Sequence, residues 1–191
     1  MLRRSMLSGL IACWMASSAS AATLEGTTFP DTYMVDGHKL VLNGLGVRTL
    51  TIFRVRIYVA GLYLTQPNHD ATAILESPGP KVVRLQFIHS GSKSQVEKEY
   101  REGEANNCGH GECAASDQAD FEKLVAAAPA VEPGDTSTYV FTGKGVKVFA
   151  NNEMIGDFAN VDLARHLLWG FIGNHPPSEA LRRGLLGLPP E

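Results

Sequence analysis

The sequence lacks most features that mark a membrane-spanning, nucleic-acid-binding or hydrolytic protein. Beyond the start of the chain, no apolar run is long enough to cross a bilayer. The formal net charge is only −3, which argues against nucleic acid or an anionic membrane as a main partner. No serine or cysteine lies in a nucleophile motif, and Gly143-Lys144-Gly145 lacks the phosphate-loop pattern. No repeat, linker or low-complexity tract interrupts the 191 residues, so we expect one domain.

Residues 1–21 have the composition of a secretory signal peptide. Arg3 and Arg4 precede a short apolar run, and Ala19-Ser20-Ala21 offers a small-residue cleavage site. We therefore expect an exported, periplasmic protein whose mature domain spans residues 22–191. Lipid attachment at Cys13 is the less favoured alternative, because cleavage there would leave almost no apolar run behind the arginines.

Cysteine is scarce, and one of the three cysteines would leave with the leader. Cys108 and Cys113 remain, and export to an oxidising compartment favours a disulfide between them. Two thiols and His110 do not complete a tetrahedral site, so we expect neither a metal nor another cofactor. The remaining histidines have no metal-ligand or triad spacing, and we interpret them as surface residues or as residues with satisfied hydrogen bonds: His38, His69, His89, His166 and His175.

The apolar pattern predicts an α+β domain with strands first, helices in the middle, and then a meander followed by two helices. The expected strands are residues 23–29, 31–42 with a hairpin turn at Asp36-Gly37, 42–64, 82–88, 137–142, 146–150 and 153–158. The expected helices are residues 70–75, a helix opened by a Ser94–Glu97 capping box, residues 116–128, a helix from Asn160 to near Gly173, and a last helix after Pro176. These elements favour a curved antiparallel sheet with helices on one face.

The segment of residues 42–64 organises the rest of the chain. A glycine-rich stretch leads to Arg48, and a long β-branched and aromatic run follows, which is typical of a central strand. The apolar alternation slips by one residue between Ile52 and Phe53, and a β-bulge usually absorbs such a slip. Whether Arg48 and Tyr58 share a face of the sheet therefore stays open.

The helix that we expect after Ser94 has an unusually polar face. Its positions i, i+4, i+7 and i+11 are Val96, Tyr100, Gly103 and Asn107. A phenol and an amide two turns apart are unusual on a face that packs against a sheet. Two explanations stay open: the stripe forms the wall of a pocket, or it carries buried polar groups with satisfied hydrogen bonds.

Three stretches of the mature chain, in the same order, resemble the chalcone isomerase superfamily: residues 42–64, 99–108 and 172–186. The likeness is closest to the exported chalcone isomerase-like branch of bacteria. It implies an open-faced β-sandwich, in which helices cover one face of a curved antiparallel sheet. In the plant enzymes this fold closes a chalcone to a flavanone by intramolecular addition.

The resemblance also implies roles for individual residues. Arg48, in Gly-Val-Arg, matches the catalytic arginine, while Tyr100 and Asn107 match the active-site tyrosine and asparagine without a gap. Two active-site threonines have no counterpart, because their positions hold Tyr58 and Gly170. Non-catalytic relatives bind fatty acids and hold the carboxylate with the same arginine and a strand tyrosine. Arg48 with Tyr58 resembles that arrangement.

We therefore expect a non-catalytic binder of a fatty acid or similar amphipathic acid, with Arg48, Tyr58, Tyr100 and Asn107 as ligand-binding residues. The alternative is an intramolecular lyase or isomerase that acts on a chalcone-like, phenolic or enone substrate. There Arg48 would stabilise the enolate, and Tyr100 and Asn107 would order the substrate or water as catalytic residues. A second alternative is a structural or interaction domain with a vestigial cleft.

Overall fold

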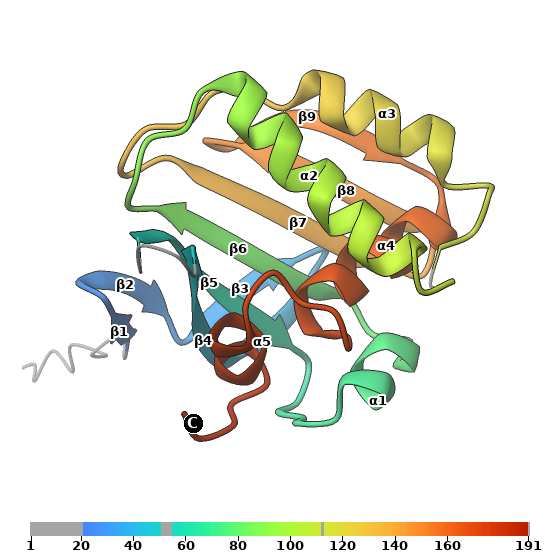
Figure 1. Ribbon diagram of the computed structural model, residues 1–191. Coiled ribbons are helices and arrows are strands. Elements are labelled where there is room, and N and C mark those ends of the chain that lie inside the picture. The colour runs from blue at the N-terminus through green and yellow to red at the C-terminus, as the bar shows by residue number, and fades with distance from the viewer. Residues whose placement is uncertain (1–20, 51–54, 112, 191) are drawn as a thin grey trace, which may run out of the picture.

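The computed structural model describes residues 21–50, 55–111 and 113–190 (Figure 1). Seven strands in this part of the chain form one antiparallel sheet, in the order β3-β4-β5-β6-β7-β8-β9, so each strand pairs with its neighbours in sequence. The strands are β3 (Thr32–Val35), β4 (His38–Leu50), β5 (Val55–Leu64), β6 (Lys81–Phe87), β7 (Thr136–Thr142), β8 (Gly145–Ala150) and β9 (Glu153–Phe158). The predicted α+β fold is confirmed.

The helices cover one face of this sheet (Figure 1). They are α1 (Ala71–Glu76), α2 (Lys93–Cys108), α3 (Gln118–Ala127), α4 (Val161–Ile172) and α5 (Glu179–Leu185). The main core lies between the helices and the sheet and contains Tyr58, Ala60 and Leu62 of β5. None of the described helices is both long enough and apolar enough to pass through a membrane.

The opposite face of the sheet carries a smaller core that includes Val59 and Tyr63. A separate hairpin of β1 (Ala21–Leu24) and β2 (Thr27–Pro30) contributes Phe29 to it. The prediction of a single strand over residues 23–29 is therefore wrong. Glu25 and Gly26 have φ values of 50° and 74°, as a type I′ hairpin turn requires, but Glu-Gly is a weaker turn signal than Asp-Gly.

The predicted turn at Asp36-Gly37 is confirmed, with φ values of 45° and 80°. The prediction of one long strand over residues 42–64 is wrong, because β4 and β5 form an antiparallel pair with Leu50 opposite Val55. Alternation alone does not distinguish one long strand from a hairpin with two apolar arms. The slip that we predicted at Ile52–Phe53 lies outside the described residues.

A β-bulge in β5 sets the direction of Tyr58. Arg48 pairs with Tyr58 and Thr49 pairs with Arg56, so Ile57 is an extra residue between them. Residues directly opposite in an antiparallel pair project from the same face, so Arg48 and Tyr58 share a face. The main core lies on that face.

The glycines before Arg48 allow α5 to lie directly on β4. A Cβ atom on Gly44 would lie 2.1 Å from the carbonyl oxygen of Gly184, and one on Gly46 would lie 2.2 Å from that of Leu181. No side chain fits in either gap. This contact also brings the chain just before α5 against Arg48, whose Nη1 donates a hydrogen bond to the carbonyl oxygen of Pro177 (2.7 Å).

The helix starts follow from capping side chains. Asn160 caps α4 and Ser178 caps α5, and both helices begin where the sequence predicts. The capping box of α2 is formed by Ser92 and Gln95, not by Ser94 and Glu97, so α2 begins two residues earlier than a Ser94 cap would place it. The sequence holds two overlapping boxes with the same spacing, which is why the prediction chose the wrong one.

Candidate functional site

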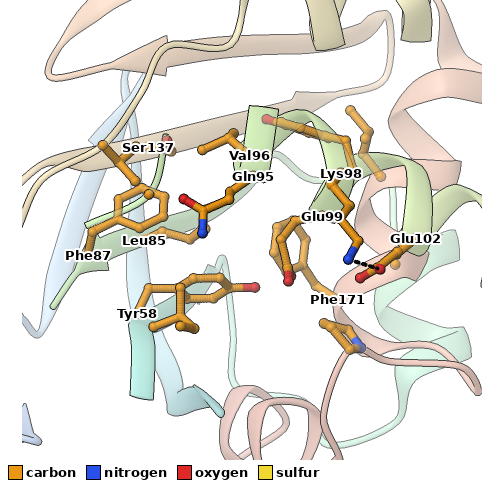
Figure 2. A pocket seen from close by; sticks show the side chains of 18 of the residues that line it. Tyr58, Leu85, Phe87, Gln95, Val96, Lys98, Glu99, Glu102, Ser137 and Phe171 are labelled. Carbon is orange, nitrogen blue, oxygen red and sulfur yellow. Dashed lines mark ion pairs between the residues drawn. The ribbon is translucent and has the colours of Figure 1, made fainter. Parts of the chain in front are cut away.

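A cavity of 530 Å³ lies between the sheet and helices α2 and α4. Its wall is largely apolar and includes Leu85 and Phe87 of β6, Val96 of α2, and Leu167 and Phe171 of α4. Figure 2 shows several of these side chains around the open centre. The volume lies within the range of about 300–1,000 Å³ that is usual for small-molecule sites.

The polar stripe of α2 forms part of the cavity wall. Val96, Tyr100, Gly103 and Asn107 all border the cavity. The polarity of this face fits its position, because it borders an open space and Tyr100 also reaches the sheet through a hydrogen bond with Tyr139. Both explanations left open by the sequence apply: the stripe borders a pocket, and the hydroxyl of Tyr100 has a hydrogen-bond partner.

Three tyrosines from three elements border the cavity: Tyr58 of β5, Tyr100 of α2 and Tyr139 of β7. The hydroxyl of Tyr58 points into the cavity (Figure 2). The hydroxyls of Tyr100 and Tyr139 share a hydrogen bond of 2.5 Å. Sequence reasoning missed Tyr139, although it lies in a predicted strand and alternates with Ser137, which borders the same cavity.

All three phenols resist ionisation because they are buried. Burial raises the pKa of Tyr58, even though the positive charge of Arg48 acts to lower it. Burial raises the pKa of Tyr100 to about 12, against the opposing effect of its hydrogen bond with Tyr139. Burial also raises the pKa of Tyr139 well above its ordinary value. At neutral pH the cavity therefore presents neutral hydroxyl groups that can donate hydrogen bonds.

Arg48 lies beside the cavity but does not border it, and its guanidinium contacts Glu99 of α2, which does. Nε and Nη2 of Arg48 face the Glu99 carboxylate, with a shortest distance of 3.1 Å. Its Nη1 donates to the carbonyl oxygens of Thr49 (2.9 Å) and Pro177 (2.7 Å). Arg48 is 7% exposed, and its neighbours Tyr58, Glu99 and Pro177 all border the cavity.

Asn107 is 1% exposed, and its Oδ1 has no hydrogen-bond partner in the described part of the chain. It borders the cavity close to Gly170 of α4, where a Cβ atom would lie 3.3 Å from Nδ2 of Asn107. Tyr58 and Gly170, the positions without the family's threonines, thus both border the cavity. Of the four predicted ligand-binding residues, Tyr58, Tyr100 and Asn107 meet at one cavity, and Arg48 lies at its edge.

A buried imidazole–carboxylate pair also adjoins the cavity. Nδ1 of His166 lies 3.1 Å from Oδ2 of Asp117, and the two side chains are 3% and 2% exposed. The imidazole stacks on Phe121 with 5.4 Å between ring centroids, and it borders the cavity. The interpretation of His166 as a satisfied residue agrees with this pair. Because the partners are far apart in sequence, no spacing signal pointed to it.

The predicted disulfide between Cys108 and Cys113 is present. Its two sulfur atoms and a ring nitrogen of His166 lie within 4.8 Å of one another. The bonded sulfurs are not thiolates, which are the form of cysteine that binds metal ions. His110 does not join this group but stacks on His175, with 3.6 Å between ring centroids.

The sequence comparison matches residues 21–187 to the family model of chalcone isomerase-like proteins. The chain belongs to the chalcone isomerase-like family. No curated protein matches the sequence. Among solved structures, the chalcone isomerase-like chain is similar to a fatty-acid binding protein of Arabidopsis thaliana. The TM-score is 0.68 at 16% identity, and the match covers 87% of this chain and 96% of the plant protein. At this identity the likeness shows the shared fold.

Proposed function

We propose that this chalcone isomerase-like protein binds a fatty acid or a similar amphipathic acid in the cavity and catalyses no reaction on it. The observation that carries the proposal is a largely apolar cavity of 530 Å³ with a buried arginine at its edge. The apolar wall suits an acyl chain. A fixed guanidinium beside it suits the acid group of such a ligand.

The position of Arg48 fits this role. Arg48 and Tyr58 are directly opposite on paired strands, so a charged donor and a neutral phenol project from the same face of the sheet. The carboxylate of Glu99 already pairs with the guanidinium of Arg48 at 3.1 Å, so Arg48 is oriented to bind a carboxylate. In this arrangement Tyr58 or Tyr100 donates a further hydrogen bond to the ligand, and Asn107 orients it. The printed name of the plant neighbour, a fatty-acid binding protein, supports the same ligand class.

We also propose that the protein belongs to the exported bacterial branch of the family and works in the periplasm after removal of residues 1–21. A disulfide between Cys108 and Cys113 supports an oxidising compartment. The intact mass of the protein from the periplasmic fraction tests this, with Ala22 as the expected first residue. A chain that keeps its leader, or one that stays in the cytoplasm, would contradict it.

Binding can be tested with delipidated protein and displacement of a fluorescent fatty acid by dodecanoate. Wild-type protein should bind dodecanoate more tightly than its methyl ester, which has no charge. Arg48→Ala should weaken binding of the acid at least about tenfold and abolish the preference over the ester. Arg56→Ala is the matched control, since Arg56 lies on the same strand pair but is exposed and pairs with Glu25. Equal affinity of wild type and Arg48→Ala would refute the proposal.

An isomerase is the second candidate, because Tyr100 and Asn107 border one cavity, as the family's active-site pair would. The bond-forming step would be addition of a phenolic oxygen to an enone within one molecule, which depends mostly on orientation. The absorbance of a 2′-hydroxychalcone follows this reaction. A rate equal to the spontaneous one rules the isomerase out. If Arg48→Ala, Tyr100→Phe and Asn107→Ala are silent in both assays, the cleft is vestigial.

A further inference from the structure

Glu99 occupies the side of Arg48 that a ligand carboxylate would need. A guanidinium holds a carboxylate best by two parallel hydrogen bonds along one edge. The Nε–Nη2 edge of Arg48 faces both oxygens of Glu99, at distances between 3.1 and 3.4 Å. The other end of the guanidinium is committed to the backbone, because Nη1 donates to the carbonyl oxygens of Thr49 and Pro177.

Glu99 is nevertheless free to leave. Its side chain is 38% exposed, whereas that of Arg48 is 9% exposed. A carboxylate with access to water can leave its partner more easily than a buried one, and an incoming acid group would restore the negative charge beside the buried guanidinium. Nη1 of Arg48 donates to two backbone carbonyls, and these hydrogen bonds do not depend on Glu99.

We infer that Glu99 is an internal competitor for the ligand: its carboxylate fills the head-group position in the empty protein and is displaced when an acid binds. The inference rests on the proposed function, namely that the cavity binds an amphipathic acid. Two carboxylates cannot share one edge of a guanidinium, and their like charges repel at close range. Ligand and Glu99 therefore exclude each other, and Glu99 sets the affinity for the acid.

The surroundings of Glu99 point the same way. Glu99 borders the cavity and comes from α2, next to Tyr100. A head group in the place of the Glu99 carboxylate would lie between Arg48 and the cavity, close to Tyr58, so its acyl chain could enter the apolar space directly. The site also takes one planar acid group at a time, because the Nη1 end of the guanidinium is already used by backbone carbonyls.

The test compares two glutamates of the same helix. Glu99→Gln weakens the competitor without changing its size, and Glu99→Ala removes it. Both should bind dodecanoate about tenfold more tightly than wild type, while affinity for the methyl ester stays unchanged. Glu102→Gln removes the same charge from the cavity rim, but Glu102 pairs with Lys98 at 3.4 Å and not with Arg48. It should change the affinity less than about twofold.

The gain should also depend on the arginine. In the Arg48→Ala background, Glu99→Gln should not tighten the binding of dodecanoate, because there is no guanidinium for Glu99 to occupy. Equal gains from Glu99→Gln and Glu102→Gln would overturn the inference, since general charge repulsion would explain both. Weaker binding in Glu99→Gln would also overturn it and would make Glu99 a residue that positions Arg48. These outcomes leave the proposed function standing if Arg48→Ala still loses the acid, whereas absence of binding to every variant refutes the proposed function itself.

Discussion

Tyr100 and Tyr139 join helix α2 to strand β7 across the cavity, through hydroxyl oxygens 2.5 Å apart. The two residues are 39 positions apart in sequence, and burial raises the pKa of both. The contact connects the helical side of the cavity to the sheet by two groups that stay neutral at ordinary pH. This hydrogen bond therefore links two walls of the cavity without placing a charge inside it.

The first prediction concerns alkaline pH. The phenol of Tyr100 has a pKa of about 12 in the folded protein but about 10 in the unfolded chain. The folded state thus holds this proton more tightly, and its contribution to stability is full below pH 10 and is lost as the pH rises to 12. By pH 11 the loss from Tyr100 should be on the order of 1 kcal/mol.

Urea unfolding at pH 8, 10 and 11 measures this decline in the free energy of unfolding. Tyr100→Phe provides the comparison, because it keeps the ring and removes the ionisable group. Its free energy of unfolding should fall less steeply over the same pH range. An equally steep fall in the variant would show that ionisable groups other than Tyr100 cause the loss of stability at alkaline pH.

The second prediction concerns two glycines with opposite surroundings. Gly46→Ala should lower the free energy of unfolding by about 3 kcal/mol or more, because the new methyl group would meet the backbone of α5 at Leu181. Gly103→Ala should raise it by up to about 1 kcal/mol, since Gly103 lies within α2 and nothing beyond its own stretch of helix lies within 4 Å of the added Cβ. Chemical denaturation of the two variants measures whether the free energy of unfolding falls in the first and rises in the second. A neutral Gly46→Ala would mean that α5 does not lie on β4 as described.

The third prediction concerns the pair of Asp117 and His166. Asp117→Ala should cost about 1–3 kcal/mol of stability, because it leaves a buried imidazole nitrogen without its hydrogen-bond partner. Glu122→Ala is the control, since it removes a carboxylate of α3 that pairs with Arg101 at the surface. Its unfolding midpoint should stay close to that of wild type. Similar unfolding midpoints for the two variants would show that the buried pair stabilises the protein no more than a surface ion pair does.

The fourth prediction concerns the disulfide at the end of α2. Replacing Cys108 and Cys113 by serine removes the cross-link of a short loop and should cost about 2 kcal/mol of stability. Because Asn107 precedes Cys108, the end of the helix that carries it should also exchange its amide hydrogens faster. Mass-detected hydrogen exchange on the wild type and the double variant compares this region with α4. Unchanged protection would show that packing alone holds Asn107.

Local signals predicted much of the fold. Asp36-Gly37 forms its turn from two residues alone, and Asn160 and Ser178 cap their helices through their own side chains. The bulge at Ile57 was not predictable in the same way, because a bulge exists only relative to a partner strand. The chain reversal between β4 and β5 was missed for the same reason, because it too depends on how two strands pair.

The residues of the candidate site also differ in whether the local sequence could predict them. Tyr100 and Asn107 share one helix, so their common direction could be predicted from spacing. Tyr139 and His166 reach the cavity from separate elements, and nothing in the local sequence marks that meeting or the pairing of His166 with Asp117. Glu99 stands next to Tyr100 in the sequence, yet its contact with Arg48 depends on how α2 crosses the sheet.

The two glycines of β4 have a consequence for the order in which the protein matures. Arg48 is made early, but the Pro177 carbonyl that holds its Nη1 is made near the end of synthesis, with the helix that rests on Gly44 and Gly46. Until that helix is in place, Arg48 lacks its hydrogen bond to Pro177, although Thr49 and Glu99 have already been made. The last part of the chain to be made therefore completes the polar surroundings of Arg48, and it also adds Leu181 and Leu185 to the main core.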